Sequence, residues 1–150
     1  MIDLKVRLLK PEAVLPAIQT EGASGMDLHA CLTTPVVVLP GERAVIPTGI
    51  AIELPNGYEA QVRARSGLAA KNGIGLVNGI GTIDSDYRGE LSVILINWGQ
   101  EDFIVEPSMR IAQMIISKYE RVEMKIVNEL SESIRGENKF GSTGTGAQIS

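Results

Sequence analysis

Short runs of apolar residues alternating with polar ones recur along most of the chain. The first spans residues 2–8, where Ile2, Leu4, Val6 and Leu8 share one face of an extended chain and charged residues occupy the other. A period of two predicts a half-buried strand. Strand-like runs continue at residues 36–39, 44–46, 50–54, 58–64, 77–83, 91–97, 103–105, 111–117 and 122–127.

Glycine and proline separate many of these runs. Pro40-Gly41, Pro55-Asn56-Gly57 and Trp98-Gly99 have the turn chemistry that ends one strand and starts the next. Many short strands joined by such turns predict a sandwich, a barrel or a jelly roll. A single short helix is expected at residues 66–72, with Ser66 as its N-cap and Gly73 as its stop.

Composition narrows the range of functions. At 150 residues and 44% hydrophobic content, the chain fits one domain with a real core. Its net charge of −4 argues against a nucleic-acid-binding surface, so an anionic substrate needs a local cluster of cations and N–H groups.

Cys31 is the only cysteine, which excludes an intrachain disulfide and a zinc cluster and fits a reducing cytoplasm. No run approaches transmembrane length, so no membrane partner is expected. The lone His29 is expected to be structural.

The most polar chemistry lies between Gly81 and Glu90, at the tip of an expected hairpin. This stretch holds the carboxylates of Asp84 and Asp86, the ring of Tyr87 and a guanidinium. One interpretation is an ordinary hairpin turn, and the other is a site with a catalytic carboxylate. A calcium loop is excluded, because the EF-hand pattern needs Glu at its twelfth position and this chain has leucine there.

Three other positions offer polar groups in structured settings. Arg65 and Ser66 at a helix start could form an anion site or simply a cap. Gln113 lies in an apolar strand, on the face of Ile111 if no bulge intervenes, and its amide needs a partner. Asp27 adds a carboxylate where a turn leads into a strand.

Residues 131–150 are polar and rich in glycine, serine and threonine, which predicts a mobile terminus. Within them, residues 135–144 combine cationic side chains, the ring of Phe140 and closely spaced backbone N–H groups that could surround a phosphate. A Walker site is excluded, since Ala147 and Gln148 replace the required Lys and Ser/Thr. Simple disorder and a phosphate-binding arm both remain open.

Together these segments resemble the trimeric dUTPase family, the deoxyuridine triphosphate nucleotidohydrolases. Five family motifs occur in order: residues 24–28 (SGMDL), 65–69 (RSGLA), 78–89 (NGIGTIDSDYRG), 110–113 (RIAQ) and 135–144 (RGENKFGSTG). The third and fifth are highly specific. The resemblance implies an all-β, jelly-roll-like barrel, known as a β-clip, over residues 1–130. It also implies a flexible C-terminal arm over residues 131–150.

The implied reaction is hydrolysis of dUTP to dUMP and diphosphate, which lowers dUTP and supplies dUMP for thymidylate synthesis. By resemblance, Asp84 is the general base that aligns a water for attack on the α-phosphorus, and Asp86 supports the turn. Tyr87 packs beneath the deoxyribose and excludes a 2′-hydroxyl. The uracil edge is read by the hairpin through Asn78, Gly81, Thr82 and Ile83.

The phosphate chain is held, by the same resemblance, by Arg65, Ser66, Gly67 and Gln113, with Asp27 orienting the arginine of the tail. Mg²⁺ is the implied cofactor, bound through the phosphates and water rather than by a protein cage. The arm is a lid that orders on the substrate. It contributes Arg135 to the terminal phosphate, Phe140 to the uracil face, and Gly141, Ser142 and Thr143 over the triphosphate.

The resemblance also implies a homotrimer in which each site is shared between subunits. The chain departs from the family pattern at Ala64, Asn138 and Lys139, although the spacing from Arg135 to Phe140 is kept. Two alternatives remain: a deoxycytidine triphosphate deaminase of the same fold, and a jelly-roll binding module without catalysis.

Overall fold

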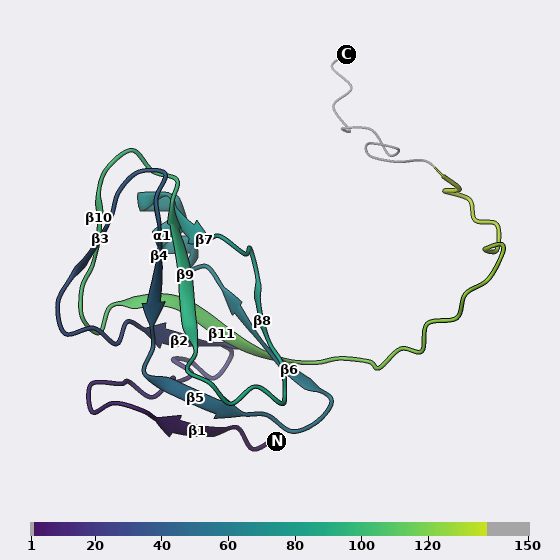
Figure 1. Ribbon diagram of the computed structural model, residues 1–150, viewed down its shortest axis with the longest axis horizontal. Helices are drawn as coiled ribbons and strands as arrows, with labels where there is room; N and C mark the ends of the chain where they lie inside the picture. The colour runs from purple at the N-terminus through teal and green to yellow at the C-terminus, as the bar shows by residue number, and fades with distance from the viewer. Residues whose placement is uncertain (1, 138–150) are drawn as a thin grey trace, which may run out of the picture.

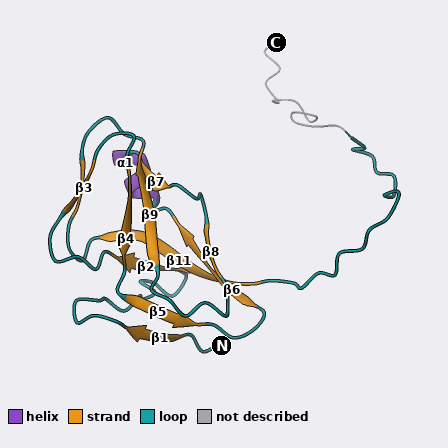
Figure 2. Ribbon diagram, in the orientation of Figure 1, coloured by secondary structure: helices purple, strands orange, loops and turns teal. Residues whose placement is uncertain are grey.

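The computed structural model describes residues 2–137 of the chain. Within them it is almost entirely β-structure with a single helix, as predicted (Figures 1 and 2). The elements are β1 (Lys5–Leu8), β2 (Gly25–His29), β3 (Val36–Val38), β4 (Arg43–Pro47), β5 (Ile50–Glu53), β6 (Tyr58–Arg63), α1 (Ser66–Asn72), β7 (Ile74–Leu76), β8 (Gly81–Ile83), β9 (Ser92–Asn97), β10 (Phe103–Val105) and β11 (Arg110–Lys118).

All of the strand pairs are antiparallel, and most join strands that are distant in sequence. One sheet has the order β2-β11-β6-β8 and another the order β4-β9-β7, while β1 pairs with β5 and β10 with β3. Figure 1 shows β4 and β9 side by side, with β11 crossing below them between β2 and β6. The C-terminal strand β11 therefore lies at the centre of the largest sheet.

The core lies between these sheets and is built by strand alternation. In β9, Val93 and Leu95 point inward while the residues between them are more exposed. The same face carries Asn97, which is fully buried but satisfied: its Nδ2 donates to the carbonyls of Val38 (2.9 Å) and Glu101 (2.7 Å). A buried amide with complete hydrogen bonds fixes the end of β9 at little cost.

The helix has the predicted bounds, Ser66–Asn72, but its N-cap lies one residue before the predicted one. Arg65 occupies the N-cap position with extended φ and ψ angles of −86° and 124°, and no side chain caps the helix. The prediction that Ser66 is the N-cap is therefore wrong. Gly73 ends the helix as predicted, in the left-handed region at φ 69°, where a residue with a side chain would be strained.

Two strand predictions are also wrong. Residues 77–83 are not one strand, because β7 ends at Leu76 and a turn with Gly79 at φ 67° precedes β8. Residues 122–127 form no strand, although their alternation is regular. Moreover, β8 pairs with β6 and β9 pairs with β4 and β7, so the strands on either side of Asp84 belong to different sheets. The expected hairpin around Asp84 is instead a connection between two sheets.

Beyond β11 the chain leaves the barrel. The amide of Tyr119 donates to the Gly57 carbonyl (3.0 Å), and the following residues extend away from the sheets (Figure 1). Val122, Met124 and Ile126 are 81%, 91% and 102% exposed, so these apolar side chains pack against no core among the described residues. Within residues 2–137, no helix is long and apolar enough to span a membrane.

Candidate active site

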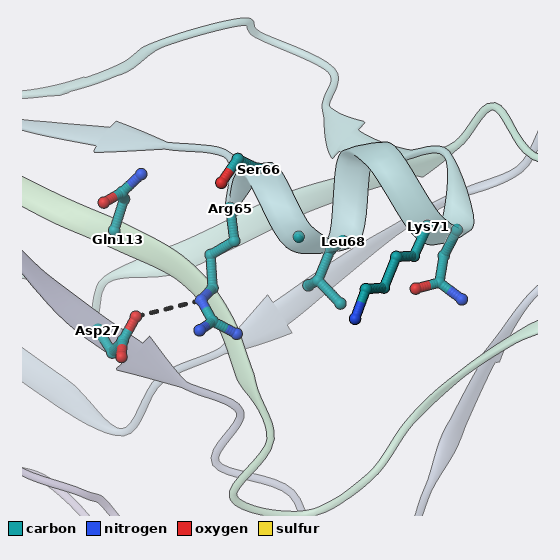
Figure 3. A pocket seen from close by; sticks show the side chains of 8 residues that line it. Asp27, Arg65, Ser66, Leu68, Lys71 and Gln113 are labelled. Atoms are coloured by element: carbon teal, nitrogen blue, oxygen red, sulfur yellow. Dashed lines mark ion pairs between the residues drawn. The ribbon is translucent and has the colours of Figure 1, made fainter.

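The first candidate site is a pocket of about 420 Å³ at the start of α1, here called the arginine pocket. Figure 3 shows Arg65 reaching from the start of the helix to Asp27 on β2, with Gln113 on β11 nearby. The pocket joins residues of three of the five sequence motifs. Its lining is Asp27, Arg65, Ser66, Gly67, Leu68, Lys71, Asn72 and Gln113.

A single carboxylate organises the cations here. Asp27 Oδ1 lies 3.1 Å from Arg65 Nε, and Asp27 Oδ2 lies 3.4 Å from Arg110 Nη1. The Asp27 side chain is only 13% exposed, so its partners hold it out of bulk water. Arg65 Nη1 also donates to the Arg110 carbonyl (3.2 Å). Two guanidinium groups on one carboxylate leave net positive charge beside the pocket.

The helix start adds uncharged donors. The first backbone hydrogen bond of α1 runs from Ala69 N to Arg65 O (3.0 Å). The amides of Ser66, Gly67 and Leu68 come before it, and the first amides of any helix have no partner inside the helix. Together with Arg65 and Lys71, these N–H groups make the pocket suited to a polyanion.

Strand register brings Gln113 to this pocket. On β11 it lies opposite Asp27 of β2 and Arg63 of β6. The bulge that the sequence left open is present, as a register shift between Arg110 and Ala112, and it buries Ile111 and Ala112 together. The Gln113 amide also has the hydrogen-bond partner that the sequence analysis expects. Its Nε2 donates to the Ala64 carbonyl (3.1 Å), which holds the chain just before Arg65.

The second candidate site is a pocket of about 310 Å³ between the two larger sheets, here called the Asp84 pocket. Asp84 and Tyr87 are both exposed at its edge. Apolar side chains from β4 and β9 complete its walls. Its lining is Val45, Thr82, Ile83, Asp84, Tyr87, Glu90, Leu91, Ser92 and Ile94.

The turn that carries Asp84 is held by main-chain atoms and one guanidinium. Tyr87 N donates to Asp84 O (3.1 Å), and Arg88 Nη1 donates to the carbonyls of Ser85 (2.7 Å) and Tyr87 (2.9 Å). Among the described residues, the hydrogen bonds that hold this turn come from the Tyr87 amide and Arg88, and none involves the Asp86 carboxylate. A supporting role for Asp86 stays a prediction.

Asn78 lies in the exposed turn between β7 and β8, and β8 leads directly to Asp84. A Cβ on Gly81 would lie 3.1 Å from Asn78 Nδ2 and 3.3 Å from the Val62 Cβ. Glycine at position 81 therefore gives the Asn78 amide room to lie over the start of β8. The Val77 amide donates to the Ile94 carbonyl (3.1 Å), which fixes this turn to β9.

The two pockets share no residue. The structure gathers Asp27, Arg65, Ser66, Gly67 and Gln113 in one place and Thr82, Ile83, Asp84 and Tyr87 in another. Arg135 lies in the extended segment after β11. Four further predicted site residues, Phe140, Gly141, Ser142 and Thr143, lie outside the described residues, as do Asn138 and Lys139.

The sequence interpretation missed several lining residues. Leu68 and Lys71 lie three positions apart on α1, a spacing that places both on one helix face with the pocket. Arg110 belongs to a motif but was not predicted to contact Asp27. The motifs give Glu90 no role, and only the tertiary structure brings Val45 of β4 to the same pocket.

His29 lies beside the arginine pocket on β2. Its Nδ1 is buried and has no hydrogen-bond partner within the described residues. Burial lowers the pKa of His29; Asp27 opposes this shift, and the charges of Arg110 and Arg65 add to it. A neutral imidazole in this position fits the structural role predicted for it.

Comparison with known proteins gives the family. A family model described as dUTPase matches residues 11–144. The deoxyuridine 5'-triphosphate nucleotidohydrolase of Orientia tsutsugamushi (strain Boryong) is 58% identical over 130 residues, covering 87% of this chain and 88% of the relative. That of Rickettsia canadensis (strain McKiel) is 61% identical over 130 residues, with the same coverage of 87% and 88%.

Solved structures of dUTPases also match this chain. The Staphylococcus bacteriophage 80alpha dUTPase with dUPNHPP superposes with a TM-score of 0.87 at 29% identity, covering 95% of this chain and 98% of that one. A dUTPase variant from phage phi11 of S. aureus, described with a structural Mg(II) ion, superposes with a TM-score of 0.78 at 25% identity, covering 85% and 97%. These superpositions confirm the jelly-roll-like β-fold. By family match and by fold, this chain belongs to the dUTPase family.

Proposed function

We propose that this chain hydrolyses dUTP to dUMP and diphosphate, with Asp84 as the general base. The carrying observation is the exposed Asp84 carboxylate on a fixed turn, in a pocket that also holds Tyr87. Water is a poor nucleophile, and a carboxylate within hydrogen-bond reach accepts its proton as the oxygen–phosphorus bond forms. The bond from the α-phosphorus to the bridging oxygen then breaks, and diphosphate leaves.

Nucleoside selection belongs to the Asp84 pocket in this proposal. Asn78, with the main chain of Gly81, Thr82 and Ile83, reads the uracil edge, and the ring of Tyr87 lies under the deoxyribose. The position of the Asn78 amide over Gly81 supports this assignment. A rigid wall that leaves no room for a 2′-hydroxyl selects by exclusion, which separates substrates that share every other contact.

Phosphate binding belongs to the arginine pocket. Arg65, Gln113 and the amides of Ser66 and Gly67 face the triphosphate, and Asp27 orients the cations. The support is electrostatic: the Arg65 guanidinium, Lys71 and the start of α1 line one cavity, and the Arg110 guanidinium lies beside it on the Asp27 carboxylate. Phosphoryl transfer depends on positioning and charge neutralisation more than on covalent chemistry, so such a pocket contributes directly to the rate.

Mg²⁺ fits this site as a companion of the substrate. Within residues 2–137 no three His, Cys, Asp or Glu side chains form a group that could hold a metal ion. In this proposal the phosphate oxygens and water would supply the ligands. When bound, the ion would neutralise charge on the phosphate chain, while the protein residues orient that chain.

The proposal includes a homotrimer with shared sites. Because the two pockets share no residue within a subunit, one subunit's Asp84 pocket would face a neighbour's arginine pocket. The barrel ends with β11 at Lys118 rather than at residue 130, and in this proposal residues 131–150 form an arm that closes over a site on another subunit. The arm would contribute Arg135, Phe140, Gly141, Ser142 and Thr143. The extended path after β11 supports this reach. A cytoplasmic location is part of the same proposal.

A substrate panel tests the reaction. The full-length protein with Mg²⁺ is incubated with dUTP, dCTP, dTTP and UTP, and diphosphate and ammonia are both measured. The proposal predicts diphosphate from dUTP, with the other three nucleotides spared. Ammonia from dCTP would identify a deaminase of the same fold, and tight nucleotide binding without turnover would identify a binding module.

A further inference from the structure

We propose that Glu90 is a positioning residue for sugar selection, which fixes the Tyr87 ring through a hydrogen-bonded clamp on the start of β5. The inference rests on the proposed function, because it concerns how the same site rejects a 2′-hydroxyl. Neither the sequence motifs nor the family resemblance gave Glu90 a role. It lies half-buried in the lining of the Asp84 pocket.

The clamp begins at the tyrosine itself. Tyr87 Oη donates to the main-chain carbonyl of Glu90 (3.1 Å), so the ring folds back over its own loop. The ring passes so close to Gly89 that a Cβ there would collide with the Tyr87 hydroxyl and ring carbons. The ring therefore has its position set by the main chain of residues 89–90.

That main chain is in turn tied to the start of β5. Glu90 Oε1 accepts a hydrogen bond from Gly49 N (2.9 Å), and Leu91 N donates to Ile50 O (2.8 Å). Gly49 itself cannot shift easily. It is buried at φ +70°, and a Cβ there would lie 2.6 Å from Cys31 Sγ. The Glu90 carboxylate is thus the side-chain link between a fixed strand start and the loop under Tyr87.

A second link on the other side of Tyr87 is much weaker. Arg88 Nε lies 4.0 Å from Glu53 Oε2, and the two side chains are 53% and 44% exposed. Exposed pairs of this kind contribute little to stability because water and salt screen them. Removing the Glu90 carboxylate instead leaves the buried Gly49 amide without an acceptor, a cost that the loop can relieve only by moving. Such a movement would carry the Glu90 carbonyl and the Tyr87 ring with it.

The test compares kcat/KM for dUTP and for UTP in the full-length protein with Mg²⁺. Glu90→Ala should lower the dUTP-to-UTP ratio about three- to tenfold, the range expected from losing one buried hydrogen bond. Glu90→Gln should keep the wild-type ratio, because its amide oxygen can still accept from Gly49. Glu53→Ala is the matched control, since it removes a carboxylate from the weak link, and should also keep the ratio.

Tyr87→Phe tests the clamp from its other end without removing a buried group. It should lower the ratio about as much as Glu90→Ala, and the double variant should lose little more, as expected for residues acting through one contact. An unchanged ratio in Tyr87→Phe or Glu90→Ala, or a loss in Glu90→Gln equal to that in Glu90→Ala, would overturn the inference. A wild-type protein that leaves dUTP intact would overturn the proposed function first, and the clamp's role with it.

Discussion

The arginine pocket and the Asp84 pocket are built from different parts of the fold and are held by different interactions. The arginine pocket is built from paired strands and a helix start, and a half-buried ion pair network organises it. The Asp84 pocket sits where the chain passes from one sheet to another, and hydrogen bonds to main-chain atoms hold its loop. The arginine pocket therefore provides charged groups, and the Asp84 pocket provides a loop held in a fixed position.

This difference predicts how each region responds to substitution. If the arginine pocket holds the phosphates as proposed, the loss of one charge should alter the field on each of them, so effects should appear in both binding and rate. In the Asp84 pocket, loss of the base should affect the chemical step alone, because binding depends on walls that stay in place. Four substitutions sharpen the contrast, beginning with the largest expected effect.

Asp84→Asn should lower kcat about a thousandfold, since it removes the proton acceptor while keeping the shape of the side chain. Nucleotide affinity should stay within about threefold of wild type, because the pocket walls are unchanged. Steady-state diphosphate release and calorimetric titration with a non-hydrolysable dUTP analogue measure the two quantities. Turnover close to that of the wild type would rule out Asp84 as the base.

Arg65→Met should lower kcat/KM about a hundredfold, with contributions from both KM and kcat, because a guanidinium on the phosphates is lost. Arg63→Met is a matched control on the adjoining strand. Arg63 is exposed and hydrogen-bonds Gln61 rather than lining the pocket, so its removal should leave the kinetics unchanged. Equal losses in the two variants would mean that general charge, rather than the pocket, sets the rate.

Asp27→Asn should lower kcat/KM about tenfold and the free energy of unfolding by about 1–2 kcal/mol. Asparagine keeps the volume but no longer attracts Arg65 and Arg110, so both guanidinium groups lose their common anchor. Denaturant unfolding and steady-state kinetics check the two effects. A loss of activity with no loss of stability would show that Asp27 acts on the substrate rather than through its arginines.

His29→Phe should produce the smallest effect, visible only in the pH dependence of stability. Burial, with Arg110 and Arg65, lowers the folded-state pKa of His29 below its ordinary value of 6.5, and Asp27 opposes the shift. The unfolded chain therefore binds a proton first as the pH falls below 6.5. Wild-type stability should decline relative to that of the variant on acidification, with no difference above neutrality. Parallel curves below pH 6.5 would contradict this account.

Some parts of the fold could be predicted from the sequence, and others could not. Period-two patterns identified most strands, and Gly73 marked the helix end, because both signals are local. Residues 122–127 show the limit. Apolar and polar residues alternate from Val122 to Ile126, but strand formation also needs a partner strand, and the described residues offer none. The hairpin expected around Asp84 failed for the same reason, since sheet membership depends on pairing with distant strands.

The site residues show the same difference between local signals and contacts that join distant segments. The motifs brought Asp27, Arg65 and Gln113 to one cavity, where strand register fixes their neighbours. The motifs could not predict that Asp27 binds Arg110, nor that Glu90 reaches across to Gly49, because both contacts join segments more than forty residues apart. Long-range hydrogen bonds of this kind have no signature in local sequence.

We propose that the two pockets form one active site only when they come from different subunits. Asp84→Asn and Arg65→Met, each nearly inactive alone, are unfolded, mixed in equal amounts and refolded together. If sites are shared between neighbours in a trimer, random mixing should restore about a quarter of wild-type activity, because that fraction of sites receives both intact pockets. Activity no higher than that of the separately refolded variants would contradict the shared site and place the whole reaction within one subunit.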